Sequence, residues 1–431
     1  MNEKLFQFIW QMKLFDGSGP FLTTDGQQIH ILNAGRLNHH AGPDFLEARI
    51  RAGHTTWAGN IELHIRSSDW KKHQHHKDPG YANIILHVVY EDDDPVFTAT
   101  QTSFPTLVLH HQIKPELLSA YEKLMSQMTF IPCAESIRVV KELTIHQQMD
   151  RMLVERLEEK TIYIEALLTR YKNNWQEVFY VVLAKSFGAQ INQVPFERLA
   201  MQTPLLLFSK HKQQALQIEA LIFGQSGFLN DYFDEPYPQM LQREYQHLKN
   251  KYSLQALEKH LWKFLRLRPA NFPTIRLAQF AALLQQSTHL FSALLESKKL
   301  SDMRELFTFE VSAFWQNHYT FQEVSPERIK SIGSVFVDTL LINAALPVMY
   351  IYGRLQGNES CCDRALEFLK QIRPEKNAII DRWENLNIAC HSAGDSQALL
   401  HLRKHYCELK RCLECSIGFE ILKSPPPANG N

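Results

Sequence analysis

Two short stretches near the N-terminus decide the fold. Residues 57–65 read Trp-Ala-Gly-Asn-Ile-Glu-Leu-His-Ile, in which Ile61, Leu63 and Ile65 alternate with polar neighbours. This alternation predicts a β-strand with one face in the core and one polar face. Residues 84–90 read Ile-Ile-Leu-His-Val-Val-Tyr and are almost continuously apolar, which predicts a central strand buried on both faces.

A connecting helix and an earlier strand complete the predicted N-terminal domain. The polar residues 67–79 are long enough for a helix of about three turns before Pro79-Gly80 ends it. Ile29 and Ile31 alternate with polar neighbours in a strand-like segment upstream. The order strand, strand, helix, strand indicates an α/β domain with a mixed sheet and flanking helices over residues 1–130.

The remainder of the chain has a helical pattern. Met149, Leu153 and Leu157 recur at helical spacing, and prolines interrupt the later helices. We therefore expect an all-helical region over residues 131–423, with a division into two subdomains near residues 270–300 left open. The proline-rich residues 424–431 are expected to form a disordered tail. The predicted fold class is α+β.

Composition restricts the cellular context. The 46 Lys and Arg residues balance 46 Asp and Glu residues, so a nucleic-acid or membrane partner would have to be met by a local patch. The seven cysteines crowd toward the C-terminus, which argues against a disulfide framework and favours the cytoplasm. The apolar residues 335–352 contain Asp338 and Pro347, which predicts a pair of buried helices and no membrane partner.

Acidic and imidazole side chains gather on the polar face of the predicted strand. Glu62 and His64 are two residues apart, so they project from the same face. If Pro43-Asp44 begins the preceding strand, Asp44 lies beside Glu62, and two adjacent carboxylates suit Mg²⁺ or Mn²⁺. A neutral imidazole could accept a proton near pH 7, so Asp44, Glu62 and His64 are the predicted catalytic residues.

This pattern resembles the signature of the PD-(D/E)xK nuclease superfamily, in which Pro-Asp is followed by an acid two residues before a lysine. The resemblance implies a restriction-endonuclease-like fold, a metal ion held by Asp44 and Glu62, and a third residue that positions the attacking water. That residue is His64 here, which cannot supply the constant positive charge of a lysine. Three nearby cations could replace it: Arg66, Lys71 and Lys72.

Other polar side chains of this region are candidates for phosphate contact or support: Asn38, Arg66, Asp69, His73 and His76. Three of them, Asp69, His73 and His76, would share one face of the predicted helix, which leaves a zinc-dependent hydrolase as an alternative. His87 lies in the buried strand and is predicted to be a hydrogen-bonded core residue.

A second candidate site is Cys407-x4-Cys412-x2-Cys415. This spacing matches that of plant-type iron–sulfur ligands, with a fourth ligand expected from upstream, such as Cys133 or Cys390. Structural zinc and buried reduced thiols are the alternatives. Certain PD-(D/E)xK nucleases hold an iron–sulfur cluster with one distant and three C-terminal cysteines, which is a similar layout.

The whole chain also resembles an uncharacterised bacterial family, domain of unknown function 2851, in segments such as 41–45 and 268–273, but this resemblance implies no activity. Residues 266–276 carry three arginines near aromatic side chains, a combination typical of surfaces that follow a nucleic-acid strand or of a loop packed between helices. The working hypothesis is a divalent-metal-dependent nuclease whose helical region grips DNA or RNA. The alternative is an inactive nuclease-like scaffold whose helical region binds protein.

Overall fold

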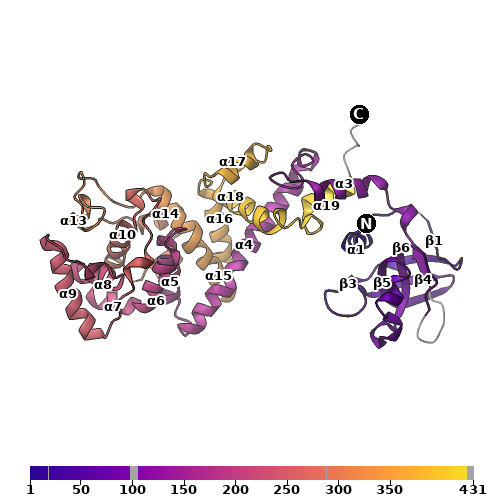
Figure 1. Ribbon diagram of the computed structural model, residues 1–431, viewed down its shortest axis with the longest axis horizontal. Helices are drawn as coiled ribbons and strands as arrows, with labels where there is room; N and C mark the ends of the chain where they lie inside the picture. Colours follow the sequence, from indigo (N-terminus) through magenta and orange to yellow (C-terminus); the bar gives the residue numbers. More distant parts are fainter. Residues whose placement is uncertain (18, 98–104, 288, 425–431) are drawn as a thin grey trace. The chain divides into compact units, whose positions relative to one another are not determined.

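A computed structural model describes residues 1–17, 19–97, 105–287 and 289–424. Two compact units, drawn in Figure 1, divide the chain. The first comprises residues 1–149, 382–388 and 401–424, and the second comprises residues 150–381 and 389–400. Apart from Ser424, the predicted tail lies outside the described residues.

Within the described residues, seven strands of the first unit form one mixed sheet in the order β1-β2-β4-β5-β6-β7, with β3 paired to β4. Strands β1 to β5 pair antiparallel, whereas β5–β6 and β6–β7 pair parallel. The strands are β1 (Phe21–Leu22), β2 (Gln28–Asn33), β3 (Arg36–Leu37), β4 (Phe45–Ala52), β5 (Thr55–Arg66), β6 (Ile84–Glu91) and β7 (Thr106–Val108). Together with the large helical remainder, the mixed sheet confirms the α+β class.

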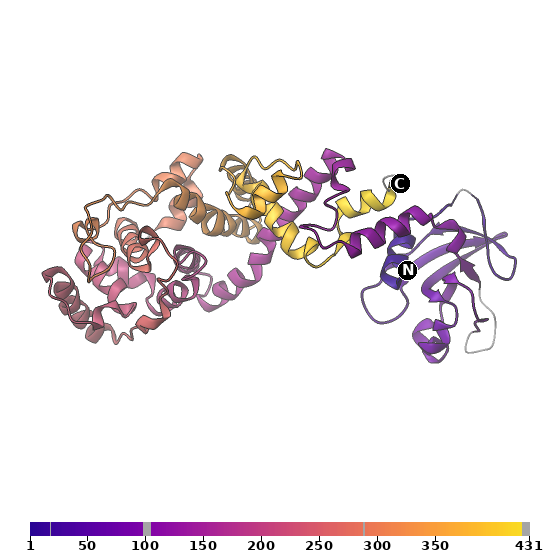
Figure 2. The same cartoon turned by 45° about the horizontal axis from the view of Figure 1, so that its top comes forward.

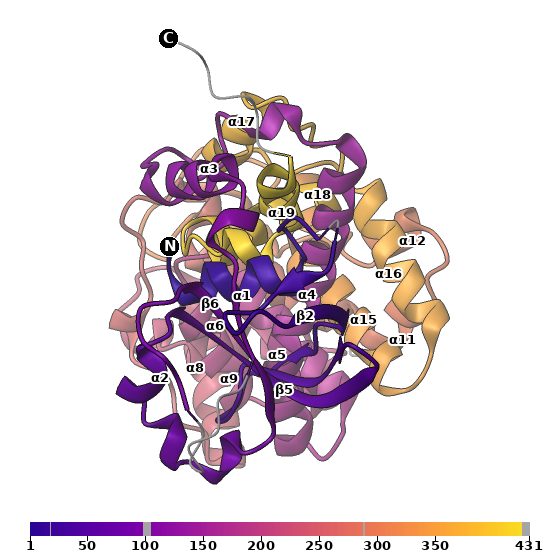
Figure 3. The ribbon, with the colours of Figure 1, turned by 90° about the vertical axis from the view of Figure 1, so that its right-hand side faces the viewer.

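Helix α1 (Glu3–Gln11) covers the apolar face of the sheet. Figure 3 shows it beside β5 and β6. It begins at Asn2, whose side chain accepts a hydrogen bond from the Leu5 N–H, and it buries Phe6 and Trp10 completely. On β5, Ile61 and Leu63 face this core, as their alternation predicted. Each fully buried side chain of this kind contributes about 1.5–3 kcal/mol, which fixes the register of β5.

The connection between β5 and β6 differs from the predicted three-turn helix. Helix α2 (Asp69–Lys72) is a single turn, followed by the 3₁₀ turns at His75–Lys77 and Pro79–Tyr81. Gln74 adopts a left-handed conformation with φ of 60°, which stops the helix. After the buried Trp70 the next residues are polar, so a longer helix would have had no apolar face to bury. The irregular connection lies over the polar face of β5.

The C-terminal segment returns to the first unit. Helix α19 (Ser416–Lys423) packs against α3 (Pro115–Ser126), and Figure 2 shows the two helices side by side. Phe419 of α19 stacks edge-on against Phe8 of α1 with ring centroids 6.0 Å apart. The Ser416 N–H donates to Gln148 Oε1 at 2.9 Å, near the start of α4 (Glu142–Arg170). The unit that contains the sheet therefore extends beyond residue 130 and includes residues far along the chain.

The second unit is helical in its described residues. Its core is rich in aromatic side chains, and Phe280 lies with its ring 5.0 Å from that of Phe187 and 6.3 Å from that of Phe196. The remaining helices of the chain are α5 (Trp175–Phe187), α6 (Gln193–Gln202), α7 (Leu205–His211), α8 (Ala215–Gln225), α9 (Pro236–Tyr252), α10 (Pro273–Gln286), α11 (Leu290–Glu296), α12 (Leu300–Glu305), α13 (Ala313–Gln316), α14 (Ser334–Leu340), α15 (Leu346–Leu355), α16 (Glu359–Gln371), α17 (Ala378–Glu384) and α18 (Ala393–Leu402).

The apolar residues 334–355 form one helical run, where the sequence predicted two helices. A π-helical turn at Leu341–Ala345 joins α14 to α15, and Pro347 follows it without a break. The carbonyl of Asn343, which Pro347 cannot bond because it lacks an N–H, accepts a hydrogen bond from Lys160 Nζ at 3.1 Å. By length and composition this run could cross a membrane, but 67% of its most apolar window is buried inside the structure.

A candidate metal centre on the polar face of the sheet

Asp44 and Glu62 lie side by side where β4 begins. Phe45 of β4 pairs with Ile61 of β5, which brings the residues next to them together. The Asp44 N–H donates to Glu62 Oε2 at 2.9 Å, and the Leu63 N–H donates to Asp44 Oδ2 at 3.1 Å. Asn38 shapes the loop before Asp44, because its Nδ2 donates to the Pro43 carbonyl at 3.0 Å. Asn38 therefore supports the backbone that precedes Asp44, which is one of the two roles predicted for it.

The Asp44 carboxyl is held in an environment that disfavours its charge. Burial, and then the neighbouring Glu62, raise the pKa of Asp44 from 3.8 to about 7. Gln7 of α1, which no sequence pattern singled out, donates from Nε2 to Asp44 Oδ1 at 2.8 Å. Two neighbouring carboxylates that are shielded from water repel each other unless a proton or a cation lies between them.

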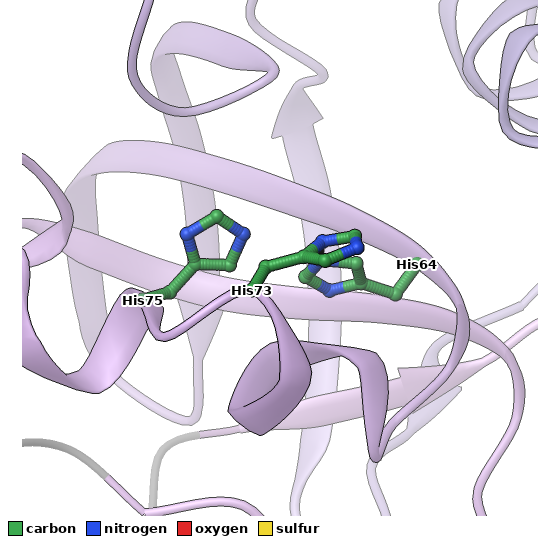
Figure 4. A group of neighbouring side chains, drawn as sticks. All are labelled: His64, His73 and His75. Carbon is green, nitrogen blue, oxygen red and sulfur yellow. Dashed lines mark hydrogen bonds between the residues drawn. The ribbon is translucent and has the colours of Figure 1, made fainter.

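Three histidines gather beside Glu62. The ligand atoms of His64, His73 and His75 all lie within 4.8 Å of one another, and Figure 4 shows the three rings above β5. His64 Nε2 is 3.2 Å from His73 Nδ1. Glu62 Oε1 lies 3.3 Å from His75 Nε2 and 3.7 Å from His64 Nε2. Glu62 therefore has Asp44 on one side and the imidazoles on the other.

His64 is buried as a neutral imidazole. Its side chain is 1% exposed, and burial together with the neighbouring histidines lowers its pKa to about 2. Its Nδ1 lies 2.8 Å from His87 Nε2, and burial lowers the pKa of His87 to about 3. The prediction that His87 is a hydrogen-bonded core residue is confirmed. When His64 donates through Nδ1 to His87, the lone pair on its Nε2 faces His73 and His75.

The side chains of Asp69 and His76 do not join the group of ligand atoms that contains His73, although the His73 N–H donates to the Asp69 carbonyl at 2.8 Å. Asp69 accepts a hydrogen bond from the Arg66 N–H at 3.2 Å and lies 3.4 Å from Lys72 Nζ, so it stabilises the turn after β5. The i, i+4, i+7 spacing fails because the helix ends before Gln74, and that end brings His75 into the group in place of His76. His75 was missed because its position depends on one left-handed residue.

The three cations proposed as substitutes for a lysine form ion pairs with surface acids. Arg66 lies 3.8 Å from Glu91, and Lys71 Nζ lies 2.6 Å from Asp94. Lys72 is the partner of Asp69 and is 75% exposed. Among the described residues, the basic side chains in ion-pair contact with Glu62 are both histidines.

The donor set fits a divalent metal ion. His75 Nε2 is buried and makes no hydrogen bond to any described residue, although it lies 3.3 Å from a Glu62 oxygen. A cation would satisfy this nitrogen, the neutral His64 and the paired carboxylates together. Carboxylates alone suit Mg²⁺ or Mn²⁺, whereas imidazoles with one carboxylate suit Mn²⁺, Fe²⁺ or Zn²⁺.

Fold and site together define an α+β protein with a buried carboxylate–histidine group of metal-ligand type. The chain belongs to the family described as Protein of unknown function (DUF2851), whose profile matches residues 3–378. No curated protein and no solved structure matches it.

Proposed function

We propose that the N-terminal sheet domain is a divalent-metal-dependent nuclease that hydrolyses phosphodiester bonds of DNA or RNA. The observation that supports this proposal is the pair of neighbouring carboxylates, the partly buried Asp44 and the buried Glu62, with three imidazoles on the far side of Glu62. An ion bound there would polarise a phosphate and lower the pKa of a bound water.

The order of elements supports a PD-(D/E)xK type of nuclease. Helix α1 is followed by the antiparallel strands β2, β4 and β5, then by a short helical connection, and then by the buried parallel strand β6. The Pro43-Asp44 turn and the Glu62-x-His64 strand occupy adjacent strand positions, as the resemblance implies. The departure is His64, which stands where that resemblance implies a lysine.

The histidines divide into two roles under this proposal. His64 is too deeply buried to meet solvent, so we assign it to holding the ion, with His87 fixing its orientation. His73 is the exposed member of the group and is assigned to accepting the proton of the attacking water. Tyr81 stacks on His75 with ring centroids 3.9 Å apart and restricts its motion.

Local cations support a nucleic-acid partner despite zero net charge. A groove of about 520 Å³ is lined by the two arginines Arg36 and Arg49 and by one acid, Glu47. Asn60, which also lines it, lies two residues before Glu62 on β5. In the second unit a cavity of about 570 Å³ is lined by Arg276, Arg328 and Lys330, and none of its described lining residues is acidic. Both environments favour phosphate groups.

The test is cleavage of end-labelled single- and double-stranded DNA and RNA by the full chain, with Mg²⁺, Mn²⁺ or Zn²⁺ supplied in turn. Glu62→Gln and His73→Gln are expected to abolish cutting, whereas Asp92→Asn, at an exposed carboxylate just after β6, retains it. Cutting that survives Glu62→Gln would overturn the proposal.

A second candidate is an inactive nuclease-like scaffold. It is favoured by one observation: the three cations considered as substitutes for a lysine, Arg66, Lys71 and Lys72, are each paired with an acid other than Glu62. In that case the wild-type chain binds nucleic acid or protein but cuts no substrate with any of the three ions.

A further inference from the structure

Four of the seven cysteines converge in the first unit. Cys407 ends a π-helical turn (Arg403–Cys407), Cys412 opens a 3₁₀ turn (Cys412–Glu414), and Cys415 directly precedes α19. The fourth is Cys133, more than 270 residues upstream, in the loop before the 3₁₀ turn at Ile137–Val139. The packing of α19 against both 3₁₀ turns brings these segments together.

The thiols are close enough to affect one another. Burial, and then the negative charge of Cys133, Cys415 and Cys412, raise the pKa of Cys407. Burial and the charges of Cys415 and Cys412 likewise raise the pKa of Cys133. No cysteine of the chain forms a disulfide, and all seven lie in the described residues. The sequence left Cys133 and Cys390 open as the fourth member, and the structure selects Cys133.

Four thiols from two distant parts of the sequence offer a complete set of sulfur ligands. Cys412 is buried, the other three are partly exposed, and no disulfide joins any two of them. Two cations stand beside them, because Arg403 favours the thiolate form of Cys407 and Lys410 favours that of Cys412. A metal centre ligated by thiolates is itself negatively charged, so these cations fit its surroundings.

The four thiols are not grouped as closely as a single zinc ion requires. A single zinc ion holds its thiolates at about 2.3 Å, which places tetrahedral sulfur atoms roughly 3.8 Å apart. Among the described residues, the groups of three or more ligand atoms that all lie within 4.8 Å of one another contain no cysteine. A polynuclear cluster keeps its cysteines further apart, because irons and sulfides lie between them. The x4 and x2 spacing also agrees with iron–sulfur ligands.

We propose that Cys133, Cys407, Cys412 and Cys415 bind an iron–sulfur cluster that fastens the C-terminal segment to residues 131–140. The cluster has a structural role and undergoes no redox step here. Lys410 Nζ, which donates to the Met125 carbonyl, and the Lys141 N–H, which donates to Glu420 Oε1 at 3.1 Å, join the same two segments beside it.

The experiment is anaerobic purification of the full chain, followed by measurement of iron, acid-labile sulfide and zinc per chain and by visible absorption. Wild-type protein is expected to contain iron and sulfide in equal amounts and to absorb broadly in the visible range. Cys133→Ser and Cys412→Ser should lose most of the iron and sulfide. The matched control is Cys390→Ser, a buried cysteine of the second unit, which should keep both.

Three results would overturn the proposal: one zinc per wild-type chain without iron, wild-type protein without metal, or a Cys133→Ser variant with full iron and sulfide. The wild-type measurement stays decisive even if a cysteine variant fails to fold. Glu62→Gln should retain all of its acid-labile sulfide, which only the iron–sulfur cluster contains, so this result is independent of the nuclease proposal.

Discussion

The Asp44 N–H donates a hydrogen bond to Glu62 Oε2, while the Leu63 N–H, next to Glu62, donates one back to Asp44 Oδ2. Each carboxylate thus helps to hold the backbone of the other strand in place. The two side chains are fixed before any ion arrives, which reduces the entropy lost on metal binding. It also means that a substitution at either position must preserve an acceptor if folding is to be left intact.

The first prediction concerns metal affinity. Glu62→Gln keeps an oxygen for the Asp44 N–H but removes the negative charge between Asp44 and the imidazoles. Binding of Mn²⁺, measured by isothermal titration calorimetry, should weaken by about 100-fold or more. Loss of a side chain that only supports a metal ligand already weakens metal binding by about 10–100-fold, and Glu62 is proposed to be a ligand itself. Thermal stability without metal should not fall. Equal affinity in the variant and the wild type would exclude Glu62 as a ligand.

The second prediction concerns Asp44 in metal-free protein. Because the pKa of Asp44 is raised from 3.8 to about 7 on folding, its contribution to stability is complete below about pH 4 and is lost as the pH rises through 7. Asp44→Asn should therefore increase the free energy of unfolding by roughly 1–3 kcal/mol at pH 8 and by little at pH 4. This range is lower than the full pKa shift would give, because Asp44 is partly exposed and solvent screens its charge.

Urea unfolding in the presence of a chelator measures this difference. Gln7 can reverse its amide to accept from the amide that the Asp44→Asn substitution introduces, so the hydrogen bond is retained. Asp92→Asn, at an exposed position, is the control and should show no such pH dependence. Destabilisation of Asp44→Asn at pH 8 would contradict the assignment.

The third prediction concerns acid sensitivity. The pKa values of His64 and His87 are lowered to about 2 and about 3, so both stay neutral in the folded chain while the unfolded chain takes up protons below 6.5. Stability present above pH 6.5 is therefore lost as the pH falls. His87→Gln preserves a partner for His64 Nδ1 and should reduce the slope by about 1.4 kcal/mol per pH unit below 6.

Unfolding free energies at pH 7, 6 and 5 provide the measurement for His87→Gln. His30→Gln, at an exposed position of β2, should leave the slope unchanged. The same slope in His87→Gln and wild type would show that His87 is protonated in the folded protein.

The fourth prediction concerns the cavity of the second unit. Arg276 lies there with its guanidinium 3.4 Å from the centre of the Phe336 ring, and burial lowers its pKa to about 10, so it stays charged near pH 7. Arg276→Gln should weaken binding of a single-stranded oligonucleotide by up to about tenfold. The slope of log affinity against log salt concentration should become less steep by about the amount that one phosphate contact contributes. Fluorescence anisotropy at several salt concentrations measures both. An equal loss in the exposed control Arg198→Gln would indicate a general effect of charge.

Local periodicity was enough to predict β5 and β6, because Ile61 and Leu63 must face one core and the register follows from that. The proximity of Asp44 to Glu62 followed from the pairing of neighbouring strands. Gln7, 37 residues from Asp44, could not be found this way, because only tertiary packing of α1 brings it close. The single-turn α2 and the place of His75 depend on the backbone of Gln74, for which glutamine carries no sequence signal.

Residues 401–424 belong to the unit that also contains the sheet, although residues 150–400 separate them from its first 149 residues. During synthesis the sheet strands leave the ribosome early, whereas α19 and three of the four converging cysteines follow after a delay on the order of ten to fifty seconds at ordinary elongation rates. The second unit can be finished during that interval. The N-terminal part of the first unit therefore completes its packing only after residues synthesised much later are available. Truncation before residue 401 would leave the surface of α1 around Phe8 uncovered.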